Sequence, residues 1–273
     1  MVSIPPAAAP AQRPKPVGKR RFATLRTIFA LVLREMSTRY GRTPGGYLWG
    51  VLEPLATVIF LSLGFSLVLR SPSLGTSFLL FYATGYLPFN FYQVLSGSIA
   101  SALSFSKPLL KYPAVTWLDA VMARFLLNSL TNILIAALLF TGILAAIGNR
   151  SALDLPAIVL AIGLAMIFGL AVGVLNCVLM GLYPVWKMTW GIVTRPLFLA
   201  SGVLFLYDDL PPMAQQVLWY NPLIHITGLT RTGFFSTYNP AYISVIYVLV
   251  VSLIVLTLGL VLMGRYHRVI LNR

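Results

Sequence analysis

Residues 34–54, REMSTRYGRTPGGYLWGVLEP, join a basic segment to a long apolar one. Three arginines precede a Pro-Gly-Gly break, and Tyr47 and Trp49 follow it. Lys and Arg gather at the cytoplasmic end of a membrane span, while Tyr and Trp sit at the level of the lipid headgroups. The carboxylate of Glu53 falls just inside the apolar segment, where a charge is costly and more often functional than accidental. The stretch predicts the point at which a cytoplasmic surface element becomes a membrane span.

The composition extends this prediction to the whole chain. Hydrophobic residues make up 58% of the 273 residues and charged residues 10%, with a mean hydropathy of +0.86. Soluble domains carry about 25% charged residues, so we expect an all-α polytopic membrane protein. Nine of the twenty Lys and Arg residues lie in residues 13–42, beside one acid, Glu35. In a membrane protein, this segment is expected to meet the anionic inner leaflet rather than nucleic acid.

The apolar pattern predicts one surface helix and six spans. Residues 22–40 place apolar side chains at gaps of three and four, which predicts an amphipathic interfacial helix, with its linker extending to residue 46. We expect residues 1–21 to be a disordered basic cytoplasmic leader without a cleavable signal. A bilayer core requires about 20 apolar residues per helix. The six-helix domain, 47–273, then has spans at about 47–69, 77–101, 116–147, 155–182, 188–207 and 241–264.

The basic residues predict the orientation of these spans. If the N-terminus is cytoplasmic, the cytoplasmic connections, including a short turn at 183–187, hold fifteen Lys and Arg residues. The external connections then hold three, Arg70, Arg150 and Arg231. This imbalance follows the positive-inside rule. Both termini are therefore expected in the cytoplasm.

Two longer connections separate the spans. Residues 102–115 are cytoplasmic, and a short helix bounded by Pro108 and Pro113 fits there. Residues 208–240 are external, too polar to span and too apolar for a free loop. We expect short helices there that re-enter the outer membrane boundary. The predicted breaks are Pro211-Pro212, Asn221-Pro222 and the vicinity of Gly233.

Several kinds of site are missing from the sequence. No G-x-x-x-x-G-K-[ST] phosphate-binding loop occurs, so the chain is expected to bind no ATP in that way. The single cysteine, Cys177, and two distant histidines, His225 and His267, form no metal motif. No G-x-S-x-G motif occurs either. We therefore expect no catalytic residues, metal or cofactor in this chain.

Polar and aromatic side chains inside the predicted spans have two interpretations each. A polar stripe with i, i+4 spacing in the third span indicates either hydrogen bonding between helices or a hydrophilic wall of a substrate path. Its residues are Thr116, Ala120, Arg124, Asn128 and Asn132, with Asp119 beside them. Aromatic residues crowd the second span, and these indicate either packing or rings on which sugars stack. They are Tyr82, Tyr86, Phe89, Phe91 and Tyr92. Glu53 has Arg124 and Arg195 as possible partners.

Three segments resemble the permeases of polysaccharide-exporting ABC transporters, the type-2 ABC exporters. They are LREMSTRYGRTPGGYLWGVLEPL at 33–55, KPLLKYPAVTWLDAVMARFL at 107–126 and YNPLIHITGLTR at 220–231. Capsular polysaccharide permeases look most similar, and O-antigen permeases come second. The resemblance implies a homodimeric channel for a lipid-linked polysaccharide in the bacterial inner membrane. It also implies two copies of a cytoplasmic ATPase subunit that bind ATP and Mg²⁺, and export proteins of the periplasm or outer membrane.

The resemblance assigns roles to particular residues. The interfacial helix and a coupling helix in 102–115 would dock the ATPase, with Arg26, Lys107, Pro108, Leu109, Lys111 and Tyr112 as coupling candidates. Arg39, Tyr40, Arg42, Tyr47, Trp49 and Glu53 become entry or gate candidates, and Arg39 and Arg42 would meet a lipid pyrophosphate. Channel-lining candidates are Tyr82, Tyr86, Phe89, Tyr92, Arg124, Asn128 and Asn132. Trp219, Tyr220, Asn221 and His225 would form the external gate.

Other functions remain open at this point. A permease for O-antigen or a teichoic-acid-type glycan would carry similar features. An exporter of small drugs would use the same machinery with a narrower apolar cavity. A transferase acting on lipid-linked sugars would need acids clustered at one membrane face, whereas Glu53, Asp119 and the Asp208-Asp209 pair are scattered.

Overall fold

The computed structural model describes residues 23–40, 45–110, 115–148 and 153–272. These residues form α-helices and one 3-10 helix and contain no strand, as an all-α chain requires. The helices are α1 (Ala23–Tyr40), α2 (Gly46–Ser66), α3 (Phe78–Ala100), α4 (Ala102–Ser106), α5 (Trp117–Ile147), α6 (Leu155–Leu182), α7 (Pro184–Ala200), η1 (Tyr207–Asp209), α8 (Pro212–Leu218), α9 (Pro222–Phe234) and α10 (Val245–Asn272). The predicted leader, residues 1–21, lies outside the described residues.

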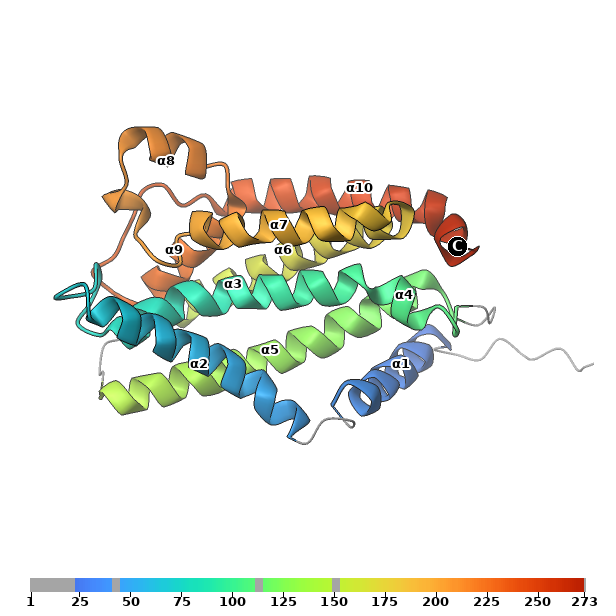
Figure 1. The fold of residues 1–273 in the computed structure, drawn as a ribbon, viewed down its shortest axis with the longest axis horizontal. Helices are drawn as coiled ribbons and strands as arrows, with labels where there is room; N and C mark the ends of the chain where they lie inside the picture. Colours follow the sequence, from blue (N-terminus) through green and yellow to red (C-terminus); the bar gives the residue numbers. More distant parts are fainter. Residues whose placement is uncertain (1–22, 41–44, 111–114, 149–152, 273) are drawn as a thin grey trace, which may run out of the picture.

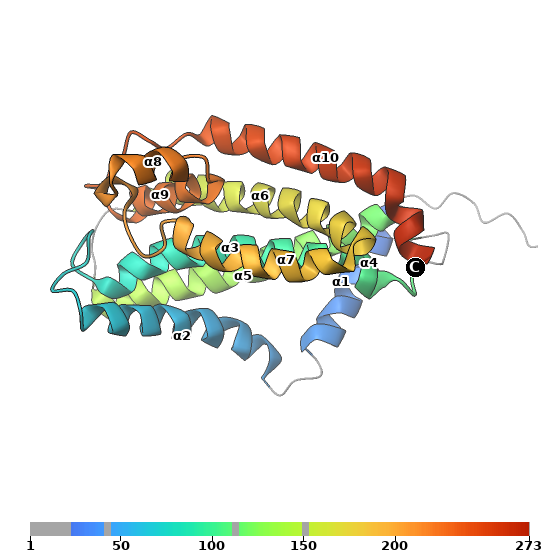
Figure 2. The same ribbon diagram turned by 45° about the horizontal axis from the view of Figure 1, so that its top comes forward.

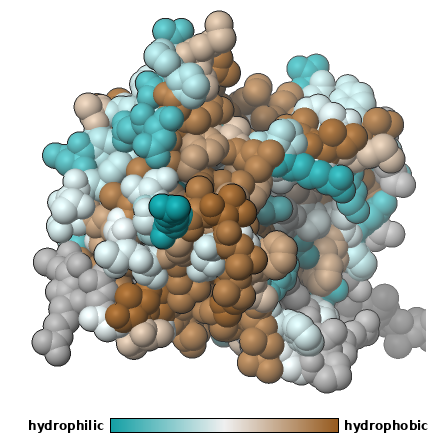
Figure 3. Space-filling view, turned by 60° about the vertical axis from the view of Figure 1, so that its left-hand side comes forward, coloured by the Kyte–Doolittle hydropathy of each residue, from teal (hydrophilic) through white to brown (hydrophobic). Residues whose placement is uncertain are grey.

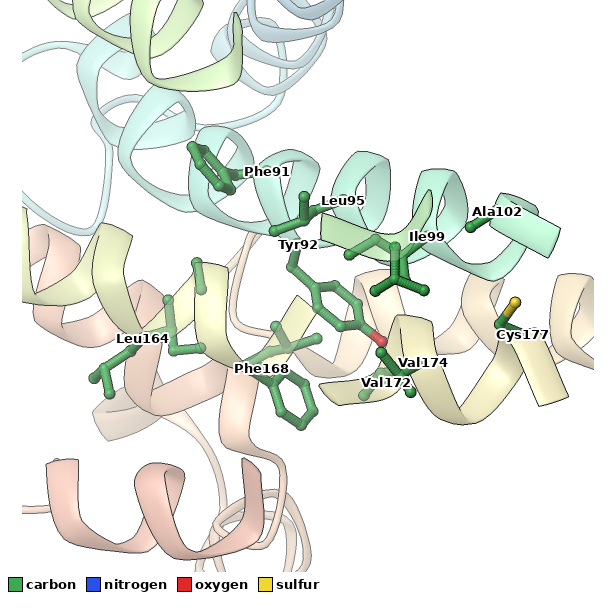
Figure 4. Packing of buried hydrophobic residues seen from close by; sticks show 14 of the residues in the cluster. Phe91, Tyr92, Leu95, Ile99, Ala102, Leu164, Phe168, Val172, Val174 and Cys177 are labelled. Atoms are coloured by element: carbon green, nitrogen blue, oxygen red, sulfur yellow. The ribbon is translucent and has the colours of Figure 1, made fainter. Parts of the chain in front are cut away.

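Helices α3 and α6 form the centre of the bundle. Helices α2, α5 and α9 pack on α3, while α10 packs on the other side of α6. The two central helices approach closely because Gly173 of α6 faces Ile99 of α3, where an added Cβ would lie 2.8 Å from the Ile99 Cβ. Nearby, the Tyr92 ring of α3 stacks on Phe168 of α6 at 5.1 Å (Figure 4). Small and aromatic side chains thus fix the relative position of α3 and α6.

The elements separate into two ends, as the orientation prediction requires. Helices α1 and α4 and the C-terminal end of α10 gather at one end, and α8 and α9 lie at the other (Figures 1 and 2). The elements that the sequence places in the cytoplasm thus lie at one end, and those that it places outside lie at the other. We call these the cytoplasmic end and the external end.

Most predicted spans coincide with helices. Predicted spans 77–101, 116–147 and 155–182 agree with α3, α5 and α6 to within one residue, and 47–69 agrees with α2 except at its end. By length and composition, four helices are suited to cross a membrane: α2 from Leu48, α5, α6 and α10. Helix α7 is only 17 residues long, and α3 carries polar residues such as Asn90 and Gln93, so these two helices are not in that set.

Two predicted spans have different bounds in the structure. The fifth was expected at 188–207, but α7 covers Pro184–Ala200 because Pro184 suits a helix's first turn and the chain turns at Gly202, with φ of 70°. The expected turn at 183–187 is therefore reduced to Tyr183. The last span was expected at 241–264, but α10 is Val245–Asn272, since basic residues continue the helix beyond the apolar segment.

The two long connections gave one correction and one agreement. The expected helix between Pro108 and Pro113 is wrong for its described part, because α4 is Ala102–Ser106 and residues 107–110 form turns. In contrast, 208–240 is broken where predicted: α8 begins at Pro212, α9 begins at Pro222 and α9 ends at Phe234, next to Gly233. Proline lacks the N–H that a helix interior needs but fits its first turn.

Helix α1 exposes the apolar face that the sequence predicts. Leu25 and Phe29 are 52% and 67% exposed, as expected for a helix that lies against lipid. The buried side chains of α1, among those described, are Leu31 and Glu35, one turn apart, and α1 packs on α5. An acid is thus turned toward the protein while apolar residues are turned away from it.

Candidate functional site

A cavity of about 610 Å³ lies between α3 and α7. It is lined by Phe89, Tyr92, Gln93, Ser96 and Gly97 of α3 and by Trp190, Gly191, Thr194, Arg195 and Phe198 of α7. Phe198 approaches Phe89 edge-on at 5.3 Å and Tyr86 at 6.4 Å. Aromatic rings and hydroxyl or amide groups therefore share the wall, which is the combination that suits a sugar chain.

A second cavity, of about 450 Å³, continues toward the cytoplasmic end. It is lined by Glu35, Gln93, Val94, Gly97, Ser98, Ser101, Phe105 and Arg124. Because Gln93 and Gly97 line both cavities, the two adjoin along one face of α3. We call this combined path the α3 groove. On the one face that Figure 3 shows, apolar and hydrophilic side chains are both exposed.

Helix α2 packs on α3 and lines neither of these two cavities. The hydroxyl group of Tyr86 neighbours the Thr57 side chain and the Glu53 carboxylate of α2. Glu53 is exposed, and so is Arg195 on α7. In the described part of the chain neither takes part in an ion pair. The suggested pairing of Glu53 with Arg195 is therefore wrong within one chain, and Arg124 has a different partner.

That partner is Glu35, an acid that the sequence analysis did not select. The Nε atom of Arg124 lies 3.1 Å from Oε1 of Glu35, and both side chains are less than a tenth exposed. Nη1 of Arg124 donates to the Ser98 carbonyl and to the Ser101 hydroxyl, both at 2.6 Å. The guanidinium also lies over the Phe105 ring, 4.5 Å from its centroid. Arg124 thus contacts α1, the end of α3, and α4 at once.

The rest of the polar stripe on α5 makes a hydrogen bond to another helix and several within α5 or its cap. Asn128 accepts a hydrogen bond from the Ser98 hydroxyl at 3.1 Å and donates to the Arg124 carbonyl, and Asn132 donates to the Asn128 carbonyl. Asn128 and Asn132 are both buried. Asp119 accepts hydrogen bonds from the Thr116 amide and hydroxyl, which caps α5. Arg124 and Asn128 thus bond to another helix, as the helix-joining interpretation expects. The bonds of Asn132 and Thr116 given above stay within α5 or its cap. Of the predicted channel residues on α5, only Arg124 borders a cavity described above.

The aromatic candidates divide between groove and core. Phe89 and Tyr92 line the α3 groove although each is only 2% exposed, while Tyr86 lies beside α2 and lines neither cavity. Tyr82 is 1% exposed and packs in a separate core against Phe81 and Phe65. Tyr82 is therefore a packing residue in the described chain.

At the external end, the four gate candidates come together. Nε2 of His225 lies 2.8 Å from the Trp219 carbonyl, and Nδ1 accepts a hydrogen bond from the Ser244 amide. Nδ1 is thus unprotonated and Nε2 donates, which defines a neutral ring. Burial lowers the pKa of His225 below its usual value, opposed by its bonds to backbone groups. Asn221 caps α9, and the Tyr220 carbonyl accepts from the Tyr247 hydroxyl.

Arg231 at this end was not selected by the sequence analysis as a site residue. It is 1% exposed, and it donates to the carbonyls of Phe205 at 2.9 Å and Val203 at 3.2 Å. Its guanidinium lies 4.4 Å from the centroid of the Phe81 ring. Arg231 thus fastens the segment after α7 to α9 and α3. The sequence could have indicated this role, because a lone basic residue in a largely apolar segment needs a hydrogen-bond or ion-pair partner.

The remaining candidates within the described residues lie at the cytoplasmic end. Arg26 is exposed on α1, and Lys107, Pro108 and Leu109 follow α4. Trp49 is 61% exposed near the start of α2. Lys111, Tyr112 and Arg42 lie outside the described residues, as do the side chains of Arg39, Tyr40 and Tyr47. In the described part of the chain, His, Cys, Asp and Glu form no group that suits a metal ion.

Comparisons with known proteins agree with this architecture. Residues 26–235 match the ABC-2 type transporter family. The chain is 30% identical to the capsule polysaccharide export inner-membrane protein BexB of Haemophilus influenzae, over 89% of this chain and 92% of BexB. It is 28% identical to the polysialic acid transport protein KpsM of Escherichia coli, over 86% and 92%. It is 27% identical to the capsule polysaccharide export inner-membrane protein CtrC of Neisseria meningitidis serogroup B, over 89% and 92%. These matches, which span most of an all-helical chain with several apolar helices, show that it belongs to the ABC-2 type transporter family.

Proposed function

We propose that the chain is the inner-membrane permease subunit of an ATP-driven exporter of capsular or surface polysaccharide. The observation that carries the proposal is the α3 groove, because its wall alternates aromatic rings with amide and hydroxyl groups. Rings stack on the apolar C–H faces of sugars and polar groups meet their hydroxyls, so a long glycan can slide without tight binding. The relatives named for capsule polysaccharide export support this substrate class.

The proposal includes six membrane crossings with both termini in the cytoplasm. Helices α3 and α7 join the four strongly apolar helices as spans, since the two lie on either side of the 610 Å³ cavity and polar residues of both, such as Gln93 and Thr194, line it. Residues 208–240 then form an external gate that re-enters the outer membrane boundary. The separation of the elements into two ends supports this arrangement (Figure 1).

A second copy of the chain completes the channel in this proposal. None of the side chains of α7 is buried in one chain, although α7 forms a wall of the groove. Glu53 and Arg195 are charged and exposed on helices that face the membrane interior, where an isolated charge is costly. Two copies that face each other across α2 and α7 shield both charges and close the groove.

ATP hydrolysis is assigned to a partner. The chain lacks a phosphate-binding loop, and a cytoplasmic ATPase subunit that binds ATP and Mg²⁺ would dock on α1 and on the 102–115 connection. Periplasmic or outer-membrane export proteins would receive the glycan. An O-antigen or teichoic-acid-type glycan is the alternative substrate.

An intramembrane transferase fits the acidic residues less well. Asp119 caps α5, Asp154 caps α6 and Glu35 is paired with Arg124. The other acids, Glu53 and the pair Asp208 and Asp209, belong to α2 and to η1 near opposite ends. General acid–base catalysis needs groups within hydrogen-bond reach of one substrate, so these residues do not form a shared site.

The function is tested by deleting the gene and measuring polysaccharide. Loss of surface glycan with accumulation inside the cell, restored by the full-length chain together with its ATPase subunit, is the expected result. Unchanged surface glycan contradicts the proposal. Glu53→Ala, Asp119→Ala and Asp208→Ala test the transferase alternative. If the chain is a transferase, one of these variants loses glycan synthesis, whereas an exporter keeps synthesis and loses only export.

The dimer is tested by cysteine cross-linking. Ile192 on α7 is 64% exposed, and Leu130 on α5 is 67% exposed. Ile192→Cys is expected to give a cross-linked dimer in native membranes, and Leu130→Cys is the control that gives none. The native Cys177 is buried and contributes little background. Equal cross-linking of both variants contradicts an interface that involves α7.

A further inference from the structure

The cytoplasmic end contains one buried ion pair in the described part of the chain, Glu35 with Arg124. A guanidinium group is planar and presents a fork of donors, so it binds several acceptors at once. Here Nε forms the ion pair with Glu35 of α1. Nη1 donates hydrogen bonds to Ser98 and Ser101, where α3 passes into α4. One side chain of α5 therefore connects three other helices.

The pair contributes to the attachment of α1. Leu25, Phe29 and Leu33 are more than half exposed, and the buried side chains of α1 among those described are Leu31 and Glu35. A buried charge needs its partner, because leaving either ion alone in a poorly solvated place is costly. A movement of Glu35 with α1 is thus expected to carry Arg124 with it.

The Phe105 ring brings α4 into the same cluster. The guanidinium of Arg124 lies 4.5 Å from its centroid, and that of Arg34, next to Glu35 on α1, lies 5.5 Å from it. A ring face attracts cations. The Phe105 ring of α4 therefore contacts Arg34 of α1 and Arg124 of α5.

Both ions of the pair also line the α3 groove. Glu35 and Arg124 border the 450 Å³ cavity, which adjoins the 610 Å³ cavity at Gln93 and Gly97. A displacement of the pair changes the shape of the cytoplasmic end of the groove. Helices α1 and α4 therefore meet the α3 groove at the Glu35–Arg124 pair.

We propose that the Glu35–Arg124 pair transmits movement of α1 and α4 to α3 and α5, and so couples the partner's ATP hydrolysis to the opening of the α3 groove. This inference rests on the proposed function, in which the ATPase docks on α1 and the 102–115 connection. Glu35 and Arg124 act as positioning residues, because their contacts join helices.

The test uses the full-length chain with its ATPase subunit. Glu35→Gln and Arg124→Gln are compared with Ser37→Ala, an exposed position on α1 whose hydroxyl bonds to the Arg34 carbonyl of its own helix. Surface polysaccharide is measured in cells, and ATP hydrolysis is measured with the purified complex in phospholipid nanodiscs. We expect export to fall at least tenfold in the two pair variants while ATP hydrolysis changes less than threefold. Export at the wild-type level in both pair variants overturns the inference.

A double variant separates coupling from folding. Glu35→Gln with Arg124→Met removes both charges, so no unpaired ion remains and the thermal stability of the complex is expected to return toward wild type. Coupling by the pair predicts that export stays at least tenfold low in this variant. Return of export together with stability overturns the inference, because the pair is then only structural. The proposed function is tested separately, by polysaccharide export in the wild-type complex. If the wild-type complex exports no polysaccharide, the proposed function is wrong.

Discussion

The two ends of the molecule each contain a buried arginine, but the two residues are bonded differently. Arg124 at the cytoplasmic end and Arg231 at the external end both lie over a phenyl ring, at 4.5 and 4.4 Å. Arg124 pairs with a carboxylate on another helix, whereas Arg231 donates to two backbone carbonyls and has no ion-pair partner in the described chain. Glu35 lies on a helix with two buried side chains among those described, so its carboxylate is expected to move more readily than the backbone carbonyls of a packed turn. The external arginine is therefore a fixed clamp, and the cytoplasmic one is a link between movable parts.

The largest effect is expected from Arg231→Met. The carbonyls of Val203 and Phe205 lose their donors in a buried place, and a space opens beside Phe81. The free energy of unfolding is expected to fall by about 3 kcal/mol, measured by denaturation of the purified chain in detergent. Arg195→Met is the control, because Arg195 is exposed and its loss is expected to cost under about 1 kcal/mol. Equal stability of the two variants contradicts the role of Arg231 as a clamp.

The clamp can also be disturbed from the opposite helix. Gly85 of α3 faces it so closely that an added Cβ would lie 2.8 Å from the Val203 oxygen and 3.0 Å from Nη2 of Arg231. Gly85→Ala is expected to cost about 1–3 kcal/mol through overpacking, measured as a lower melting temperature. Gly142 of α5 has nothing within 4 Å of such a Cβ, so Gly142→Ala is expected to be neutral or stabilising by up to about 1 kcal/mol. A harmless Gly85→Ala contradicts the close packing.

The sequence predicted the helices better than it predicted the two clusters. Hydrophobic length and proline positions identified α3, α5 and α6 to within one residue, because both act locally. Glu35 lies 89 residues before Arg124, while Ser98 and Ser101 lie 26 and 23 residues before it. The partners of Arg231 lie 26 and 28 residues before it, and no local pattern encodes such separations. Glu35 looked like one acid in a basic segment, while Glu53 attracted attention from its apolar surroundings. Only the packing of α1 on α5 distinguishes them.

A moderate effect is expected from pH at the external end. Burial lowers the pKa of His225 below the value of about 6.5 in an unfolded chain, so the unfolded state binds a proton more readily. Stability is then complete above about pH 6.5 and decreases as the pH falls toward the lower folded pKa. Protonation of Nδ1 also breaks its bond from the Ser244 amide. The melting temperature is expected to fall between about pH 7 and pH 5.

His267 provides the matched control for this pH dependence. It lies at the cytoplasmic end, and its ring nitrogen contacts carbonyls of its own helix. His225→Gln is expected to flatten the fall in melting temperature at low pH, and His267→Gln is the variant at the opposite end with which it is compared. A steeper dependence on His267 than on His225 contradicts the assignment of the buried neutral ring.

The smallest effect is expected from the ring beneath the cytoplasmic arginine. Phe105 is 39% exposed and Phe81 is 1% exposed, so the two rings differ in burial although each faces a guanidinium at a similar distance. Phe105→Leu removes mainly a cation–ring contact worth about 0.5–1 kcal/mol, while Phe81→Leu also leaves a space in a packed core. Denaturation of both variants should therefore show a larger loss for Phe81→Leu. If Phe105→Leu is the more damaging change, Arg124 is held as rigidly as Arg231, and the contrast between a clamp and a movable link fails.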